Sequence, residues 1–427
     1  MATSLRRVPL PPAPVPAPLF RRPERKVGSP ASFHALRVFL FLLYANVALW
    51  MPALEVVRPA QITVIVAALF LLYEGMSGRR RLGLIWPESP LLLAFLMAAF
   101  LSITTALWPG HAFATSIELA KCAAAYFLVA LATDTLPRLK GVLWTLVVGG
   151  LFPALGTLYF FATGRVEEGR AGWLGIFANP NDAAYSLVIL IPLAYALGSL
   201  SGWTGRLLAG VALLAYAAAI YTTFSRGGLL GFFAVLLVIG LRVRSQVMRL
   251  AAIGLMVLGL VAALYFWKRE AGFESLGEDA TVHQRLITVK AGLEMFADHP
   301  LLGVGAGCSV VGFATYAPGG ALTHKALMVH NTFVEALAET GLLGAVPYLL
   351  LFGSALLGAH RLARRRAGVD PELPVLAAGI QASIVGLTVC SLSGGYVLSW
   401  FPYILFGLVS ALRRIEPQAT AALSEAA

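Results

Sequence analysis

Apolar runs long enough to cross a lipid bilayer recur along most of this chain. A spanning helix needs about 20 mostly apolar residues, and twelve candidate runs lie between charged, glycine or proline breaks. They are residues 34–53, 59–74, 89–106, 116–133, 142–162, 183–199, 207–223, 228–242, 250–267, 341–360, 375–394 and 400–412. We therefore predict an all-α polytopic membrane protein with about 12 transmembrane helices.

The composition excludes several soluble classes. Only 12% of the 427 residues are charged and 59% are hydrophobic, against roughly 25% and 45–50% in soluble domains. A cytosolic α/β domain, a disulfide-stapled secreted domain and a disordered chain are all inconsistent with these values. The three cysteines lie far apart and form no CxxC motif, so they predict neither a disulfide nor a metal site.

The positive charges predict the orientation in the membrane. Lysine and arginine accumulate on the cytoplasmic side of membrane proteins. With both termini in the cytoplasm, most of the 32 lysines and arginines fall in cytoplasmic segments, and the opposite topology would invert this ratio. The net charge of +11 is therefore a topology signal, and a nucleic-acid partner is not expected.

The predicted spans divide the chain into five parts. Residues 1–33, basic and rich in proline, are expected to form a disordered cytoplasmic tail. Residues 34–267 hold the first nine helices, residues 268–340 a large periplasmic loop and residues 341–412 the last three helices. Residues 413–427 are expected to form a frayed cytoplasmic tail.

The long loop has the sequence pattern of a folded segment. In 283–297, Leu286, Val289, Leu293 and Phe296 recur at helical spacing. A second amphipathic stretch runs from residue 330 to residue 341 and carries two glutamates. We expect these glutamates, Glu335 and Glu339, to be solvated, and we expect the loop to rest on the outer surface of the bundle.

Three arginines are candidate ligands for an anion. Arg226 stands between two apolar runs, and an ionisable residue at membrane depth indicates function, although snorkelling to headgroups is the plain alternative. Its flanking glycines would let a large anionic ligand approach the backbone. Arg170 precedes a turn at 179–182, and Arg285 lies in the loop. We expect all three arginines to converge on one exterior cavity, where paired guanidinium bonds suit a pyrophosphate.

Three short motifs resemble one family. The pattern His330-Asn331, nine residues, then Gly341-Leu342-Leu343-Gly344 resembles the His-Asn-x9-Gly-x-x-Gly signature of the O-antigen ligase and polymerase superfamily. Residues 225–229 (SRGGL) resemble its arginine motif, and residues 299–305 (HPLLGVG) resemble the motif that precedes the histidine. The resemblance covers residues 165–345 in the expected order.

The resemblance implies a GT-C-like glycosyltransferase in the bacterial inner membrane, with its active site facing the periplasm. Its donor would be a glycan on undecaprenyl pyrophosphate. Its acceptor would be a hydroxyl of the lipid A-core in a ligase, or of another carrier-linked glycan in a polymerase. The lipid carrier is already activated, so no metal or other cofactor is implied. Ligase is the preferred interpretation and polymerase the alternative; a lipid-linked oligosaccharide transporter is the competitor from another class.

The resemblance also assigns residues. His330, a type of residue that on its own is more often structural, becomes the candidate general base. Arg226 and Arg170 would bind the pyrophosphate and stabilise its developing charge, and Arg285 is a further candidate for that role. Asn331, Gly341 and Gly344 complete the motif.

Overall fold

The computed structural model describes residues 30–50, 57–167, 169–242, 280–317, 327–365 and 370–426, with short pieces between 245 and 261. Regular structure in these residues is helical, apart from one isolated β-bridge between Glu167 and Arg170. The α-helices are α1 (Ala31–Ala45), α3 (Pro59–Met76), α4 (Glu88–Leu101), α5 (Pro109–Ala132), α6 (Leu136–Ala162), α7 (Pro180–Val188), α8 (Ile191–Ser199), α9 (Trp203–Thr222), α10 (Arg226–Gly240), α12 (Ala280–Asp298), α13 (Ser309–Tyr316), α14 (Thr332–Ala363), α15 (Glu372–Ser391) and α16 (Trp400–Ala426). Three short 3-10 helices are η1 (Val47–Leu49), η2 (Ser102–Thr105) and η3 (Gly175–Phe177).

The all-α polytopic fold is confirmed. Eight described segments are long and apolar enough to cross a membrane, and α1 and α10 are shorter apolar helices. The predicted run 250–267 lies largely outside the described residues, as do residues 1–29 of the predicted tail. One expectation is wrong: the segment after residue 412, expected to be frayed, continues α16 as a helix to Ala426.

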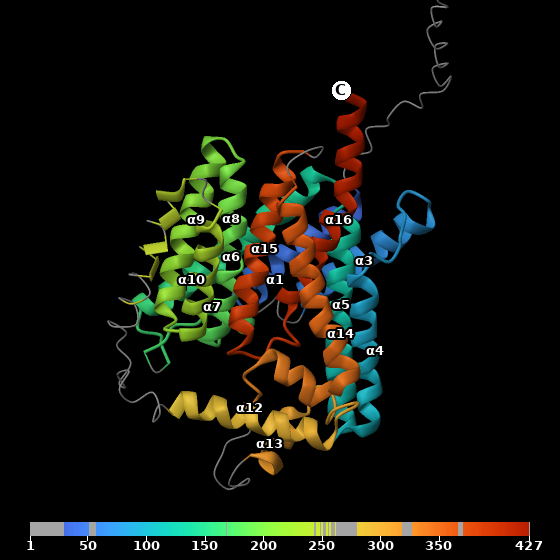
Figure 1. The fold of residues 1–427 in the computed structure, drawn as a ribbon, viewed down its shortest axis with the longest axis vertical. Helices are drawn as coiled ribbons and strands as arrows, with labels where there is room; N and C mark the ends of the chain where they lie inside the picture. The colour runs from blue at the N-terminus through green and yellow to red at the C-terminus, as the bar shows by residue number, and fades with distance from the viewer. Residues whose placement is uncertain are drawn as a thin grey trace, which may run out of the picture.

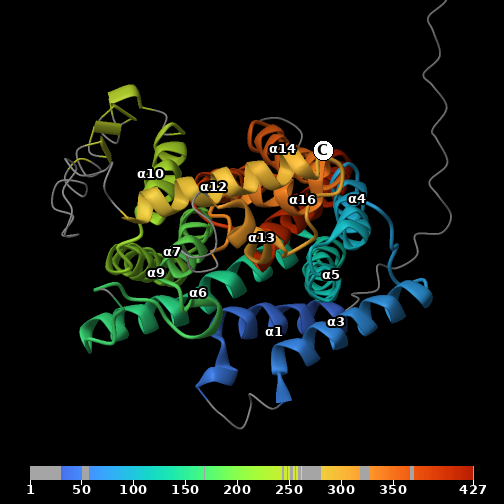
Figure 2. The same cartoon turned by 90° about the horizontal axis from the view of Figure 1, so that it is seen from below.

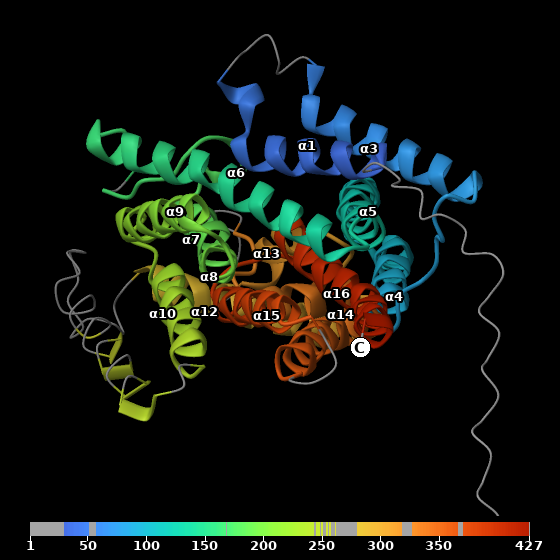
Figure 3. The same cartoon turned by 90° about the horizontal axis from the view of Figure 1, so that it is seen from above.

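The apolar helices run side by side, and the loop closes one end of them (Figure 1). Helix α12 lies crosswise under the bundle, with α13 below it, whereas the C-terminus of α16 projects from the other end. Seen from below, α12 crosses the end of the bundle near α7 and α14 (Figure 2). Seen from above, α1, α3 and α6 form one flank (Figure 3), and α14 packs between α4 and α15. We call the end that α12 and α13 close the loop end, and the opposite end, from which α16 projects, the basic end.

The loop is folded, as the sequence predicts, but α12 buries a different face. Its Ile287, Ala291 and Met295 are buried in a small separate core with residues of the following turn and of α13. Leu286 and Leu293, from the predicted apolar stripe, are 63% and 46% exposed. Helix α12 therefore has a second apolar face directed away from the protein, as expected of a helix at a membrane surface.

Helix α14 is broken at Gly341, where φ is 56° and ψ is −160°. In an unbroken helix the N–H groups of Leu342 and Leu343 would donate to the carbonyls of Ala338 and Glu339. At the break they donate instead to Pro300 and Leu301, at 2.8 and 3.1 Å. The break thus leaves the two carbonyls of α14 in need of other donors, because unpaired backbone groups are costly in a protein interior.

The turn after α12 supplies these donors. The N–H groups of Val304 and Gly305 donate to the carbonyls of Ala338 and Glu339 at 2.8 and 3.1 Å. Gly303 makes this approach possible, since a Cβ there would lie 2.4 Å from the carbonyl carbon of Glu339. Residues 300–305 therefore replace two helical hydrogen bonds of α14 with four bonds of their own and dock the loop onto this helix.

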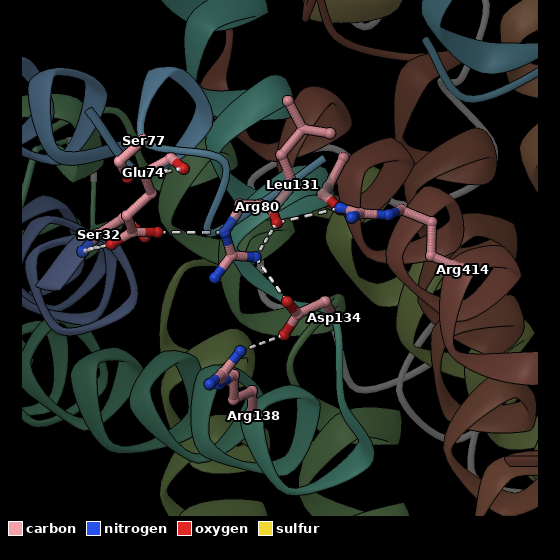
Figure 4. A network of polar contacts seen from close by, with 9 residues as sticks. Ser32, Glu74, Ser77, Arg80, Leu131, Asp134, Arg138 and Arg414 are labelled. Carbon is pink, nitrogen blue, oxygen red and sulfur yellow. Dashed lines mark hydrogen bonds and ion pairs between the residues drawn. The ribbon is translucent and has the colours of Figure 1, made fainter. Parts of the chain in front are cut away.

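At the basic end, a buried network of charges joins helices that are distant in sequence (Figure 4). The Glu74 carboxylate accepts hydrogen bonds from the Ser32 hydroxyl at 2.6 Å and from Arg80 Nε at 3.1 Å. Arg80 Nη1 also donates to Asp134 at 2.7 Å, and Arg138 pairs with the other oxygen of Asp134. Each buried charge thus has an opposite partner, as burial requires.

Replacing Arg80 with methionine should destabilise the protein by about 3–5 kcal/mol, because it leaves the Glu74 carboxylate buried without its positive partner. Thermal unfolding in detergent measures the loss. Lys290→Met is the control: Lys290 pairs with Glu294 on the exposed surface of α12, and exposed pairs contribute about 0–1 kcal/mol. Equal unfolding temperatures for both variants would contradict the importance of the network.

Replacing Gly341 with alanine should be more harmful than the same change elsewhere in α14. Its Cβ would lie 2.3 Å from the carbonyl carbon of Leu301, and the backbone conformation itself costs a non-glycine residue about 1–3 kcal/mol. The matched control is Gly353→Ala, where a Cβ meets nothing within 4 Å and helix propensity favours alanine. Thermal unfolding should separate the two, and a neutral Gly341→Ala would refute the role of the break.

Candidate active site

Two of the predicted arginines meet at one junction on the loop end. Arg170 donates from Nη2 to the Asn181 side-chain oxygen at 2.7 Å and from Nε to the Thr223 carbonyl at 3.1 Å. The Ser225 hydroxyl donates to the same Asn181 oxygen at 2.8 Å. Asn181 therefore joins the turn that carries Arg170 to the start of α10, where Arg226 follows Ser225.

Arg226 is the first residue of α10 and is half-buried. Ser225 caps this helix, accepting a hydrogen bond from the N–H of Gly228 at 3.2 Å. A helix N-terminus already attracts anions, and a cation there is unfavourable for the helix dipole. Arg226 thus adds a positive charge at this terminus, next in sequence to Ser225, which Asn181 joins to Arg170.

The glycines after Arg226 serve packing, which corrects the expectation that they admit a ligand. A Cβ on Gly227 would lie 2.1 Å from the Ser393 hydroxyl and 2.3 Å from the Tyr185 hydroxyl. A Cβ on Gly228 would lie 2.5 Å from the Ala184 Cβ. The space at both positions is filled by neighbouring side chains, so these glycines let α10 approach α7.

His330 is the first residue of the signature motif and lies against α12. Its N–H faces the Thr288 hydroxyl at 3.4 Å. Asn331 caps α14, since its side-chain oxygen accepts from the N–H groups of Phe333 and Val334 at 3.0 and 3.1 Å, and its amide donates to Leu392 at 3.3 Å. Asn331 thus fixes the backbone that presents His330.

Arg285 on α12 acts electrostatically on His330. Burial lowers the pKa of His330 below its ordinary value, and the positive charge of Arg285 lowers this pKa further. The Tyr185 hydroxyl of α7 lies 3.0 Å from the Ser393 hydroxyl, and the neighbouring Leu392 carbonyl accepts a hydrogen bond from Asn331. Residues 392–393 therefore join the histidine motif to α7.

The motif glycines have structural roles. Gly341 marks the break in α14, and Gly344 leaves room for Thr340, whose hydroxyl a Cβ would meet at 2.1 Å. In the 303–307 turn, the Gly307 N–H donates to Glu339 at 2.8 Å. This turn, which resembles a phosphate cradle only loosely, thus directs its N–H groups at α14.

The two loop glutamates are buried, which corrects the expectation that water solvates them. Glu335 and Glu339 are each 2% exposed. Glu339 accepts hydrogen bonds from the N–H of Gly307 at 2.8 Å and the hydroxyl of Ser309 at 2.7 Å. Both glutamates face inward because the break at Gly341 and the docked turn enclose the first part of α14.

A cavity that the sequence did not predict lies beside the site. It has a volume of about 260 Å³, and its wall includes Asp182, Glu335 and Tyr396. The Tyr396 hydroxyl donates to Asp182 at 3.3 Å. No sequence signal marked Asp182 and Glu335, because both fall just outside the predicted spans 183–199 and 341–360. Among the described residues, no three His, Cys, Asp or Glu side chains are grouped as metal ligands.

Comparison with known proteins agrees with the motif resemblance. Residues 209–349 match the family model of the O-antigen ligases. Over 232 residues the chain is 31% identical to the exopolysaccharide production protein ExoQ of Rhizobium meliloti (strain 1021). This alignment covers 49% of the chain and 51% of ExoQ, so the chain matches about half the length of that relative.

A solved structure described as "Structural coordination of polymerization and crosslinking by a peptidoglycan synthase complex" is also similar. That structure is 19% identical in sequence, with a TM-score of 0.43. The match covers 77% of this chain and 96% of that chain. The family match itself spans both the arginine motif and the histidine motif. Residues 209–349 of this polytopic membrane protein therefore resemble the O-antigen ligases.

Proposed function

We propose that the protein transfers a glycan from a polyprenyl pyrophosphate carrier to a hydroxyl acceptor at the periplasmic face of the bacterial inner membrane. The observation that carries this proposal is that residues 392–393 contact both the histidine motif and the start of α10. The Leu392 carbonyl accepts a hydrogen bond from Asn331, next to His330, and the Ser393 hydroxyl packs against Gly227, next to Arg226. These residues come from segments far apart in the sequence.

Helix α5 begins at the loop, where His111 meets Gly307, and ends next to Asp134, which binds Arg80 and Arg138 of the network in Figure 4. These arginines therefore lie at the end away from the loop, and the positive-inside rule directs the loop end to the periplasm.

In this reaction the neutral imidazole of His330 accepts the proton of the acceptor hydroxyl. The hydroxyl oxygen forms a bond to the anomeric carbon of the donor sugar, and the bond from that carbon to the pyrophosphate oxygen breaks. Arg226 and Arg170, with Arg285, stabilise the negative charge that grows on the leaving pyrophosphate. Because the lowered pKa keeps His330 neutral near pH 7, it is able to act as a base there.

The acceptor distinguishes two versions of this function. An O-antigen ligase would pass the glycan to a sugar of the lipid A-core, and the family model that matches the chain carries this name. A polymerase would extend another carrier-linked glycan, and the similarity to a protein of exopolysaccharide production favours this second version. Both versions use the same donor and the same residues.

Replacing His330 with alanine should abolish glycan transfer without lowering the amount of protein in the membrane. The measurement is a surface-glycan profile of the deletion strain complemented with each variant. His283→Ala, on the exposed surface of α12, is the matched control and should restore the wild-type profile. Transfer by the His330 variant would exclude this residue as the base.

The same profile identifies the acceptor. Polymeric glycan that accumulates on its carrier, with bare lipid A-core, would indicate a ligase. Single repeat units in place of polymer would indicate a polymerase. An unchanged set of surface glycans after deletion would contradict both versions.

Replacing Arg285 with glutamine should move the acid limb of the pH profile of kcat/KM to higher pH. The base is active when deprotonated, so kcat/KM falls as the pH drops through the pKa of His330, which lies below 6.5. Removing the positive charge raises this pKa, so the fall should begin at a higher pH. The measurement uses purified protein in nanodiscs with carrier-linked donor. A limb that stays in place would contradict the coupling of the two residues.

A further inference from the structure

The cavity on the loop end, which the proposed mechanism does not use, has features of a binding site. It has a volume of about 260 Å³, about the space of eight or nine water molecules in the liquid. Segments from four parts of the chain form its wall, including Asp182, Met328, Glu335, Tyr396, Trp400 and Phe401. We call it the carboxylate cavity.

Glu335 has hydrogen-bonding capacity that the protein does not use. Its side chain is on a residue only 2% exposed, and its Oε2 accepts one long hydrogen bond of 3.4 Å from the N–H of Val397. Within the described part of the chain, Oε1 accepts no hydrogen bond and no cation pairs with this carboxylate. An enclosed carboxylate without donors is costly, so its position in a cavity wall suits a ligand that brings donors.

Asp182 provides a second acceptor in the same wall. Its Oδ1 accepts a hydrogen bond from the Tyr396 hydroxyl at 3.3 Å. The oxygens of a carboxyl group accept hydrogen bonds, and a hydroxyl both donates and accepts them, so two carboxyl groups favour a ligand rich in hydroxyls. Such a ligand needs no charge, which distinguishes this cavity from the arginine junction.

Aromatic side chains complete the wall. Trp400 stacks edge-on against Phe39 with ring centroids 5.7 Å apart, and Phe401 lies against Tyr44 at 5.4 Å, so both rings are held in place. Fixed aromatic rings offer a rigid apolar surface at little entropic cost. An apolar wall with a few placed acceptors is the usual make-up of a small-ligand site, and a sugar ring presents an apolar C–H face together with hydroxyl donors.

The carboxylate cavity adjoins the candidate active site through the start of α7. Asn181 binds Arg170 and Ser225, and the next residue, Asp182, lines the cavity. The rings of Tyr185 and Tyr396 meet at 5.2 Å between the two regions. A glycan whose pyrophosphate end lies at the arginines, or whose hydroxyl approaches His330, would therefore place a sugar near this cavity.

Building on the proposed function, we propose that the carboxylate cavity binds one sugar residue of a glycan substrate, with Glu335 and Asp182 accepting hydrogen bonds from its hydroxyls. The sugar belongs either to the carrier-linked donor or to the acceptor. The chemistry of recognition is the same for both, and kinetics with each glycan varied in turn distinguishes them.

The first test is transfer by Glu335→Gln and Asp182→Asn in nanodiscs. The KM for one glycan should rise at least about tenfold, equal to about 1.4 kcal/mol, and the KM for the other should change little. A rise for the acceptor assigns the cavity to the acceptor, and a rise for the donor assigns it to the donor. Glu118→Gln, an exposed carboxylate, is the control and should leave both KM values unchanged.

A second variant, Met328→Trp, fills the cavity and leaves the Glu335 and Asp182 carboxyl groups in place. Met328 lines the cavity and is 45% exposed, so Met328→Trp should fold normally. It should raise the same KM as Glu335→Gln does. Unchanged KM values in Met328→Trp and Glu335→Gln, with active wild type, would overturn the proposal.

A binding measurement separates this proposal from the proposed function. The probe is the oligosaccharide released by mild acid from the surface polysaccharide of the host, and thermal unfolding in detergent is the readout. The oligosaccharide should raise the unfolding temperature of wild type but not of Glu335→Gln or Met328→Trp. If it does so while wild type shows no glycan transfer, the result contradicts the proposed function and leaves the sugar site standing. Saturable stabilisation by Ca²⁺ or Mg²⁺ that Glu335→Gln abolishes, without any effect of the oligosaccharide, would show a cation site instead.

Discussion

The backbone hydrogen bonds between residues 300–305 and the broken helix α14 are the contacts on which the loop end depends. Inside a membrane protein, non-helical backbone persists only where other protein groups satisfy its N–H and C=O groups. The break at Gly341 exposes two donors and two acceptors, and the turn after α12 satisfies all four. This exchange holds α12 across the bundle, encloses Glu335 and Glu339, and places His330 at the start of α14.

The charged side chains at the two ends of the bundle are arranged differently. At the basic end, Glu74, Arg80 and Asp134 satisfy one another in a closed network that joins α1, α3 and the α5–α6 turn. At the loop end, Arg226 is the first residue of α10 and Arg285 lies on α12. Buried pairs stabilise little beyond their own desolvation, whereas concentrated like charge favours a ligand of opposite sign. The first arrangement is structural, and the second supports a binding role.

The family motifs combine residues of two kinds. Asn331 caps a helix, Gly341 permits its break, and Gly303 lets the turn approach, so each meets a requirement of the backbone. The proposed mechanism assigns its chemistry to His330 and Arg226. The carboxylate cavity lies outside the motifs except for Glu335, which is why inspection of the motifs did not reveal it.

The sequence by itself determined the apolar helices, the folded loop with its helix at 283–297 and the family resemblance. These follow from local periodicity, proline and capping chemistry, and bilayer thickness, which act over a few turns of chain. Only the tertiary structure decided which face of α12 is buried, that the glutamates point inward, that Gly227 faces Tyr185, and that Asp182 and Glu335 share a cavity. These features depend on contacts between segments about 20 to 150 residues apart, such as α12 with α13 and Asp182 with Glu335. Local pattern carries no information about which distant surfaces meet.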